Sequence, residues 1–377
     1  MAESSLSWPL SVPVLSDGVV TLRAHTPADI DDMLAMAQDP VMVRNTAVPH
    51  PNTRQDSENY AFTVVRGGWD AGNHFGWAIE AEDDGRARFA GNVDIRGGRP
   101  ISDIGYALHP WARGRGLMVR AVHLAVDWAF AEAGVEIVHW NAHVGNEASL
   151  RVAHQTGFTL HGLTPGLLHE RGRVLDAWTA SRRFGDQPVP RTRWAESTVI
   201  ETDRLRLRRF VDADVPRVVE TCSDPTTRHW LNGMPHPYVE AHARGYLADC
   251  VWKAATGAKA TWAVADRETD VLLGNVAIMD MLGINSTGGE IGYWTHPDTR
   301  GRGVMTEAVR AVVEHAFDPS GLDRARLVLH AAAGNPPSNA VAVAAGFRHF
   351  GTQTAAELLG DGTFDDLRGY ELLRPGD

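Results

Sequence analysis

The chain has 377 residues, a length that predicts two or three domains at about 150 residues each. Hydrophobic residues make up 44% and charged residues 22%, which is typical of a globular protein that buries full-sized cores. The net charge of −11 argues against nucleic acid as a partner, because nucleic-acid-binding proteins usually carry a basic face, and it suits a cationic substrate such as an amine.

The cysteines and the N-terminal sequence argue against a metal-binding, disulfide-rich or secreted protein. Cys222 and Cys250 stand outside any C-x-x-C or histidine-adjacent array, so neither a metal site nor a disulfide framework is expected. Residues 1–4 lack a basic region, and Pro9 and Pro13 interrupt the apolar residues that follow, which argues against a signal peptide. Because no run of eighteen apolar residues occurs, we expect a cytoplasmic protein with no membrane partner.

The first half alternates between strand and helix patterns. Val19 to Arg23 alternates apolar and polar residues as a strand does, and Thr26-Pro27 has the N-cap and first-turn residues that open a helix. The elements expected next are a helix at 55–66, a hairpin of strands at 76–80 and 89–95, a strand at 103–108, a helix at 116–132, a strand at 135–143, a helix at 148–156 and a final hairpin.

The second half repeats this order, and short sequences recur with it. The matched segments include Gly91-Asn92-Val93 with Gly274-Asn275-Val276, Ile104-Gly105-Tyr106 with Ile291-Gly292-Tyr293, and Gly157-Phe158 with Gly346-Phe347. A repeat this long is a duplicated domain and not a solenoid. We therefore predict domains at 1–185 and 198–377, joined by a proline-containing linker at 186–197.

A basic turn with two glycines follows a strand in each half. It reads Arg113-Gly114-Arg115-Gly116 in the first half and Arg300-Gly301-Arg302-Gly303 in the second, and an amphipathic helix follows each copy. Glycines let the backbone approach a ligand closely, and the N–H groups at a helix start attract anions. Each turn is predicted to be a cradle for a diphosphate.

Both halves are similar to the Gcn5-related N-acetyltransferase (GNAT) family, and within it to the RimJ/RimL-type branch. The loop pattern Gln/Arg-x-x-Gly-x-Gly/Ala stands here as residues 113–118 and 300–305, with Met118 and Met305 in place of the last small residue. Asn-x-x-Ser followed by Gly-Phe is also present in each half, as is the strand Glu290–Tyr293 or its counterpart. The resemblance implies an α/β (α+β) fold class, with two tandem domains that each hold a twisted, mostly antiparallel sheet flanked by helices.

The resemblance also implies that acetyl-CoA binds, and it implies the residues that would contact CoA. In the second half these are Trp294, Thr295, Arg300, Gly301, Arg302, Gly303, Val304, Met305, Thr306 and Asn335, and in the first half they are Leu108, Arg113, Gly114, Arg115, Gly116, Leu117, Met118 and Asn146. In this family the strand before the turn separates from its neighbour. Backbone N–H groups near Trp294-Thr295 and Ala107-Leu108 are therefore expected to hold the developing oxyanion.

Four residues are candidates for the chemistry. An alkyl amine is protonated at neutral pH, so a carboxylate must accept its proton before it attacks the thioester. Glu290 is the best candidate, and Asp103 is its counterpart in the first half; the alternative for both is a structural salt bridge. Ser338 and Ser149 resemble the RimL-type arrangement in which a serine protonates the sulfur of CoA, and the alternative for them is a helix cap.

These features predict an acetyl-CoA-dependent N-acetyltransferase that acts on a primary amine. The acceptor is either a protein N-terminus or a small-molecule amine, and the chain forms a pseudo-dimer that is either a monomer or a homodimer in solution. We expect the second half to be the more competent catalyst, because Glu290 is one methylene longer than Asp103. The alternative is an acyl-CoA-binding regulatory protein in which one or both domains do not turn over.

Overall fold

The computed structural model describes residues 12–282 and 286–376 and divides the chain into two compact units. The first unit ends at Arg191 and the second begins at Thr192. Residues 1–11 lie outside the described residues, and they include most of the N-terminal stretch whose sequence argued against a signal peptide. Within the described ranges, no helix is both long and apolar enough to cross a membrane.

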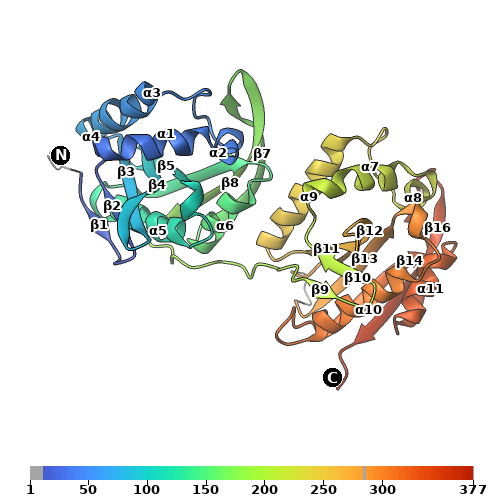
Figure 1. Cartoon of the computed structure of the whole chain (residues 1–377). Helices are drawn as coiled ribbons and strands as arrows, with labels where there is room; N and C mark the ends of the chain where they lie inside the picture. The colour runs from blue at the N-terminus through green and yellow to red at the C-terminus, as the bar shows by residue number, and fades with distance from the viewer. Residues whose placement is uncertain (1–11, 283–285, 377) are drawn as a thin grey trace. The chain divides into compact units, whose positions relative to one another are not determined.

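The first unit is an eight-stranded mixed sheet with helices on both faces (Figure 1). Its elements are β1 (Leu15–Ser16), β2 (Val20–Arg23), α1 (Ile30–Gln38), α2 (Pro40–Asn45), α3 (Arg54–Asn59), α4 (Val65–Ala71), β3 (His74–Asp83), β4 (Arg86–Gly97), β5 (Ile101–Leu108), α5 (Leu117–Glu132), β6 (Ile137–His143), α6 (Glu147–Gln155), β7 (Thr159–Glu170) and β8 (Arg173–Arg183). The strand order is β1-β2-β3-β4-β5-β6-β8-β7, and only the β5–β6 pair is parallel.

The second unit repeats this architecture strand for strand. Its elements are β9 (Ile200–Glu201), β10 (Leu205–Arg208), α7 (Val215–Ser223), α8 (Pro225–Trp230), α9 (Glu240–Ala255), β11 (Ala260–Asp266), β12 (Leu272–Met279), β13 (Gly288–Thr295), α10 (Val304–Phe317), β14 (Arg326–Ala332), α11 (Pro336–Ala344), β15 (Arg348–Leu358) and β16 (Phe364–Leu373). Its one parallel pair is β13–β14. The predicted fold class, two mostly antiparallel sheets flanked by helices, is confirmed.

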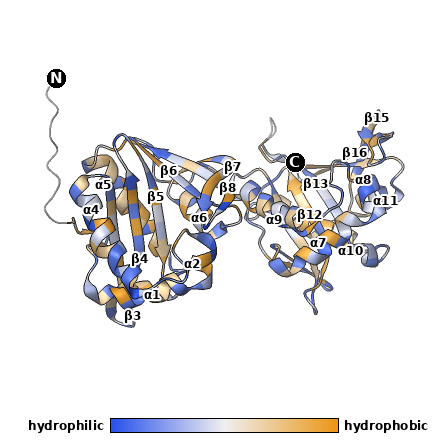
Figure 2. Cartoon of the chain, turned by 90° about the horizontal axis from the view of Figure 1, so that it is seen from above, coloured by the Kyte–Doolittle hydropathy of each residue, from blue (hydrophilic) through white to orange (hydrophobic). Residues whose placement is uncertain are grey.

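The two faces of each sheet are covered by different helices. Face A is the face under α1–α4 in the first unit and α7–α9 in the second, and face B is the face under α5 and α6, or α10 and α11 (Figure 1). Alternate residues of a strand point to opposite faces, so Trp262 and Val264 of β11 join the core beneath α10, whereas Ala263 joins the cluster beneath α7 and α9. Figure 2 shows hydrophobic residues on the strands of both units and on helices such as α2 and α7.

One predicted helix ends too early. The expected helix at 55–66 is α3, which continues through a π-helical turn at Tyr60–Val64 into α4 and stops only at Gly72. Ala61, Val65 and Trp69 are buried at four-residue spacing along it. Packing of this apolar stripe outweighs the weak helix propensity of glycine in the sequence that follows residue 66.

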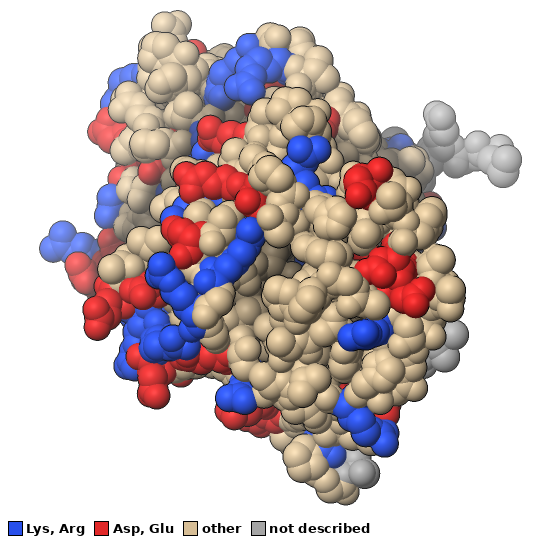
Figure 3. All heavy atoms as spheres, turned by 90° about the vertical axis from the view of Figure 1, so that its right-hand side faces the viewer, with Lys and Arg blue, Asp and Glu red and all other residues tan. Residues whose placement is uncertain are grey.

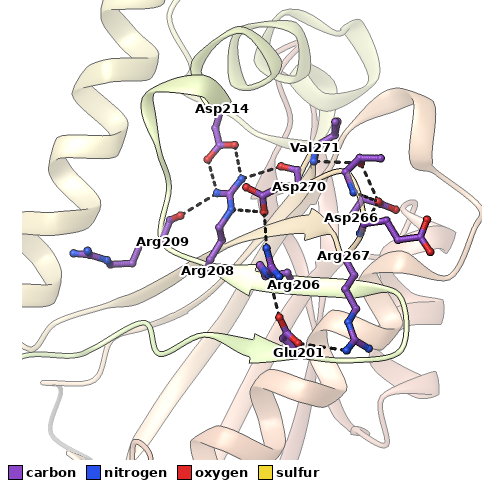
Figure 4. Close-up of polar contacts among 11 residues, drawn as sticks. Glu201, Arg206, Arg208, Arg209, Asp214, Asp266, Arg267, Asp270 and Val271 are labelled. Carbon is purple, nitrogen blue, oxygen red and sulfur yellow. Dashed lines mark hydrogen bonds and ion pairs between the residues drawn. The ribbon is translucent and has the colours of Figure 1, made fainter.

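An arginine on the second strand of each unit, β2 or β10, ties that strand to the helix that follows. In the second unit Arg208 of β10 donates two hydrogen bonds to Asp214, at 2.8 and 3.0 Å, and one to Asp270, at 2.9 Å (Figure 4). In the first unit Arg23 makes the same pair with Asp29. Elsewhere on the surface, acidic and basic side chains are interspersed on the face that Figure 3 draws, so most charges lie close to an opposite one.

Truncation of the buried partner should open the second unit locally. Asp214 is 3% exposed and Arg208 11%, so Asp214→Ala leaves a buried guanidinium without its main partner and is expected to cost about 3 kcal/mol. Hydrogen exchange of peptides spanning β10 and α7 measures this, with first-unit peptides as the internal reference. Glu201→Ala removes the exposed partner of Arg206 in the same network and should cost less than about 1 kcal/mol; equal effects of the two variants would contradict the assignment.

Candidate active site

Parallel pairing between the two central strands stops early in each unit. The paired positions are Gly288, Gly289 and Glu290 of β13 with Arg326, Leu327 and Val328 of β14, and Ile101, Ser102 and Asp103 of β5 with Ile137, Val138 and His139 of β6. Beyond Glu290 and Asp103 the strands separate, as the sequence analysis expected, and we call this separation the seam. Residues 292–295 and 105–108 are central in the sheet yet partly exposed, because the seam leaves one side of them uncovered.

Backbone donors face the seam at the end of each central strand. The N–H of His296 donates to Leu273 of β12 at 2.8 Å, and the N–H of His109 donates to Ala90 of β4 at 2.8 Å. Successive residues of a strand direct their N–H groups to opposite sides. The N–H groups of Thr295 and Leu108 therefore point into the seam, on the side away from β12 and β4.

A glycine-rich turn lies directly after each seam strand and begins a helix. Gly303 is the N-cap of α10 with φ +76°, and Gly116 is the N-cap of α5 with φ +73°, so both adopt the left-handed conformation that glycine favours. No side chain caps either helix start. An added Cβ at Gly116 meets nothing within 4 Å, and one at Gly303 meets only the end of Arg204 at 3.7 Å, so the backbone N–H groups are open to an anion.

The first arginine of each turn is a structural brace. Arg300 donates to Asp224 at 2.6 Å and to Thr227 at 2.7 Å, and Arg113 donates to Asp39 at 2.6 Å. Burial acts to raise the pKa of Asp224, but the hydrogen bonds from Arg300 and the Thr227 N–H bring it below its ordinary value. The positive charge of Arg300 and Arg113 is thus already matched by a carboxylate.

The second arginine is placed differently in the two turns. Arg302 is exposed and has no ion-pair partner within residues 12–282 and 286–376, so its charge is available to a phosphate. Arg115 donates to the carbonyl of Glu82 at 2.9 Å and lies 5.2 Å above the ring of Trp111. The remaining first-turn residues, Leu117, Met118, Val304 and Met305, bury their side chains in the core, which explains why methionine is accepted there: only the backbone faces the ligand side.

The predicted serines lie on face B, each against a tyrosine of the seam strand. The hydroxyls of Tyr293 and Ser338 are 2.9 Å apart, and Ser149 donates to Tyr106 at 3.0 Å. Burial raises the pKa of Tyr293 to about 12, so this hydroxyl keeps its proton at neutral pH. The side chains of Asn335 and Asn146 accept from the backbone N–H three residues on, at 3.2 Å, which is helix capping.

The predicted proton acceptors lie on face A and have unlike partners. His330 of β14 donates from Nδ1 to Glu290 at 3.0 Å, and this hydrogen bond raises the pKa of His330 above its ordinary value. Asp103 instead accepts a hydrogen bond from the guanidinium of Arg96 at 2.7 Å. An imidazole can lose its proton near neutral pH whereas a guanidinium cannot, so only Glu290 has a partner that can release it.

Three side chains at this site were not singled out from the sequence: His330, Tyr293 and Glu357. Burial raises the pKa of Glu357 on β15, and the nearby carboxylates of Asp365 and Glu290 add to the shift while His330 opposes it. Tyr293 could have been found from the sequence, because it is the last residue of the Glu-Ile-Gly-Tyr strand. His330 and Glu357 reach the seam through the pairing of β14 and β15 with β16, which no local sequence pattern predicts.

Curated relatives share parts of this chain. The ribosomal-protein-serine acetyltransferase of Escherichia coli (strain K12) is 35% identical over 104 residues, which are 28% of this chain and 56% of that protein. The uncharacterized N-acetyltransferase YoaA of Bacillus subtilis (strain 168) is 26% identical over 178 residues, 47% of this chain and 97% of that protein. This chain thus spans just over half the length of the first relative.

Solved structures of similar proteins each cover one half of the chain. RimL, described as a ribosomal L7/L12 alpha-N-protein acetyltransferase in complex with coenzyme A, has a TM-score of 0.43 and 21% identity, covering 48% of this chain and 100% of its own. MccE, a microcin C7 self-immunity acetyltransferase in complex with acetyl-CoA and AMP, has a TM-score of 0.41 and 18% identity, covering 46% of this chain and 93% of its own.

A family model decides the assignment. The model of the acetyltransferase (GNAT) domain matches twice, at residues 20–159 and 204–348, and so takes in both seams and both glycine turns. The two matches together cover most of the chain. The protein belongs to the GNAT acetyltransferase family, with one such domain in each unit.

Proposed function

We propose that this protein is an acetyl-CoA-dependent N-acetyltransferase that binds CoA in both units and uses Glu290 as the proton acceptor in the second. The observation that carries the proposal is the position of Glu290. It is the last paired residue before the seam opens, it lies on face A, and its partner is a titratable imidazole. The same strand ends five residues later, close to a helix start that has no capping side chain.

The chemistry divides across the sheet. A protonated primary amine gives one proton to Glu290 on face A, and its nitrogen then forms a bond to the thioester carbonyl, whose oxygen is held by the N–H of Thr295. The carbon–sulfur bond breaks, and the sulfur takes a proton from the Tyr293–Ser338 hydroxyl pair on face B. The nitrogen loses a second proton, which balances the one taken by the sulfur, and one proton per turnover leaves to solvent.

Two classes of acceptor fit this step. A protein amine is favoured by the E. coli relative, whose name specifies ribosomal-protein serine, although this chain spans only 56% of that relative. A small-molecule amine uses the same chemistry. We propose a protein amine as the first acceptor to test for the second unit.

A regulatory role is the second candidate, and one observation favours it for the first unit. The carboxylate of Asp103 is paired with Arg96, a cation that keeps its proton at neutral pH, and this pairing disfavours Asp103 as the proton acceptor there. A unit that holds acetyl-CoA without a free acceptor carboxylate would sense acyl-CoA and not consume it.

Titration of CoA should give two sites per chain. Gly303→Asp puts a carboxylate where the diphosphate would sit, while aspartate remains a good N-cap and tolerates the left-handed conformation, so the fold is kept. Gly303→Asp and Gly116→Asp should each leave one site, and the double variant none, by calorimetry. Gly303→Asn is the uncharged control and should bind more tightly than Gly303→Asp. A wild-type stoichiometry of one would contradict the two-site proposal.

Glu290→Gln should abolish proton transfer in the second unit. Introduced into the Gly116→Asp chain, in which only the second cradle binds CoA, it is expected to lower kcat by 100-fold or more with unchanged CoA affinity. Thiol release from acetyl-CoA with a panel of protein and small-molecule amines measures this. Undiminished turnover would remove Glu290 from the mechanism.

The pH–rate profile of that single-site chain should carry the titration of His330. The hydrogen bond with Glu290 raises the pKa of His330, and the protonated imidazole holds Glu290, so kcat should rise as the pH passes through the raised pKa and His330 loses its proton. His330→Asn should move this limb to lower pH, whereas His349→Asn on β15 should not. A limb that stays in place in His330→Asn would assign it to the amine itself.

A further inference from the structure

The first unit carries a polar cluster on face A that its duplicate lacks. Asp94 of β4 is buried, and its Oδ1 accepts hydrogen bonds from the hydroxyl of Tyr60 at 2.6 Å and from Nε2 of His74 at 3.0 Å. Its Oδ2 takes part in no hydrogen bond with any residue in the described ranges. Asp94 pairs with Gly105, a residue of the seam strand, so the carboxylate lies one strand away from the seam.

The fold makes room for this carboxylate. Gly76 is the β3 partner of Asp94, and a Cβ at Gly76 would lie 2.5 Å from Asp94 Oδ1. In the second unit the matching pair is Thr261 with Ala277. Gly76 thus faces the carboxylate of Asp94 in the first unit, whereas Thr261 faces the methyl group of Ala277 in the second. Only the first unit has a charged group at this place.

The neighbours of the cluster differ between the units in the same sense. His25 lies edge-on to Tyr60 and donates from Nε2 to Asn92 at 2.8 Å, while its Nδ1 is buried and has no hydrogen-bond partner in the parts of the chain described. In the second unit Phe210 lies edge-on to Tyr246, the counterpart of Tyr60. A buried, unsatisfied nitrogen is unfavourable, so it marks a place where a polar ligand would be satisfied.

The seam strand carries a smaller side chain on face A in the first unit. Ala107 packs, as Tyr60 does, against the apolar cluster on face A, and the residue at its place in the second unit is Trp294, which packs against Phe210 and the α7–α9 cluster. The pairings Asn92–Ala107 and Asn275–Trp294 establish that the two positions are equivalent. At this position of the seam strand, face A thus carries a small side chain in the first unit and an aromatic one in the second.

We propose that the first unit is a second acetyltransferase site with its own acceptor, a small polar amine that carries hydrogen-bonding groups, and that Asp94 accepts the proton of that amine. This inference rests on the proposed function, because it takes the first unit to carry out the same acetyl transfer. The amine gives one proton to Asp94 Oδ2, its nitrogen bonds to the thioester carbon, and the carbon–sulfur bond breaks. The sulfur is protonated from the Tyr106–Ser149 pair, the nitrogen loses a second proton that balances the one taken by the sulfur, and Asp94 releases its proton to solvent.

This assignment accounts for the locked Asp103. Arg96 lies 2.7 Å from Asp103, so the carboxylate at the end of the first unit's pairing ladder has a permanently charged partner, and Asp94 lies two residues away from Arg96 on the same face. In this proposal Asp94 takes the role in the first unit that Glu290 has in the second. The proposal also predicts that the two units acetylate different amines.

The Gly303→Asp chain, in which only the first cradle binds CoA, tests the proposal. We expect thiol release from acetyl-CoA with at least one member of a panel of amino acids, amino sugars and polyamines. Asp94→Asn in that chain should lower kcat by 100-fold or more while calorimetry still gives one CoA per chain. Asp70→Asn, which changes an exposed carboxylate of α4, is the matched control and should retain full turnover.

A second variant covers the case in which Asp94→Asn disturbs folding. Ala107→Trp installs the residue of the second unit and should lower kcat/KM for the polar amine by 10-fold or more, through KM, without changing CoA binding. If Gly303→Asp is inactive with every amine while Gly116→Asp turns over, the first unit only binds CoA and the inference is overturned. Retained turnover in both Asp94→Asn and Ala107→Trp would overturn it too. If wild type releases no thiol, the proposed function itself fails.

Discussion

The structure depends on a pairing ladder that ends after three residues. In each unit two neighbouring strands run parallel, bond through three positions and then separate, although both continue as strands. Elsewhere a strand end with unpaired N–H groups would be unfavourable. Here the strands separate between Glu290 or Asp103 on face A and the serine–tyrosine hydroxyl pairs on face B, which is the arrangement that the proposed mechanism uses.

The sequence allowed much of this to be predicted, because the signals are local. The glycine turn, the helix that follows it and the Glu-Ile-Gly-Tyr strand each lie within a dozen residues, and the duplication exposed their order twice. What escaped prediction depends on pairing between distant segments. The brace from Arg300 to Asp224 spans 76 residues, and the pair of His330 with Glu290 spans 40, so both follow from strand and helix packing that local patterns do not specify.

The duplication also makes the two units a controlled comparison. Their ladders and serine–tyrosine pairs coincide, whereas face A differs at several positions along the seam. Asn92 of β4 matches Asn275 of β12, but Ala277 and Met279 replace Asp94 and Arg96. Divergence on the side from which an acceptor would approach is what separate substrates would produce.

The arginine–aspartate brace beneath each glycine turn has a consequence for how fast a ligand is taken up. Arg300 is fixed by a carboxylate that also caps α8, and Arg113 by one that caps α2, so each turn is held at its first arginine and continues directly into a helix before any ligand arrives. Little chain entropy remains to be lost on association. Each unit should therefore capture its cosubstrate by simple collision, with the rate set by diffusion and docking orientation and not by the ordering of a loop.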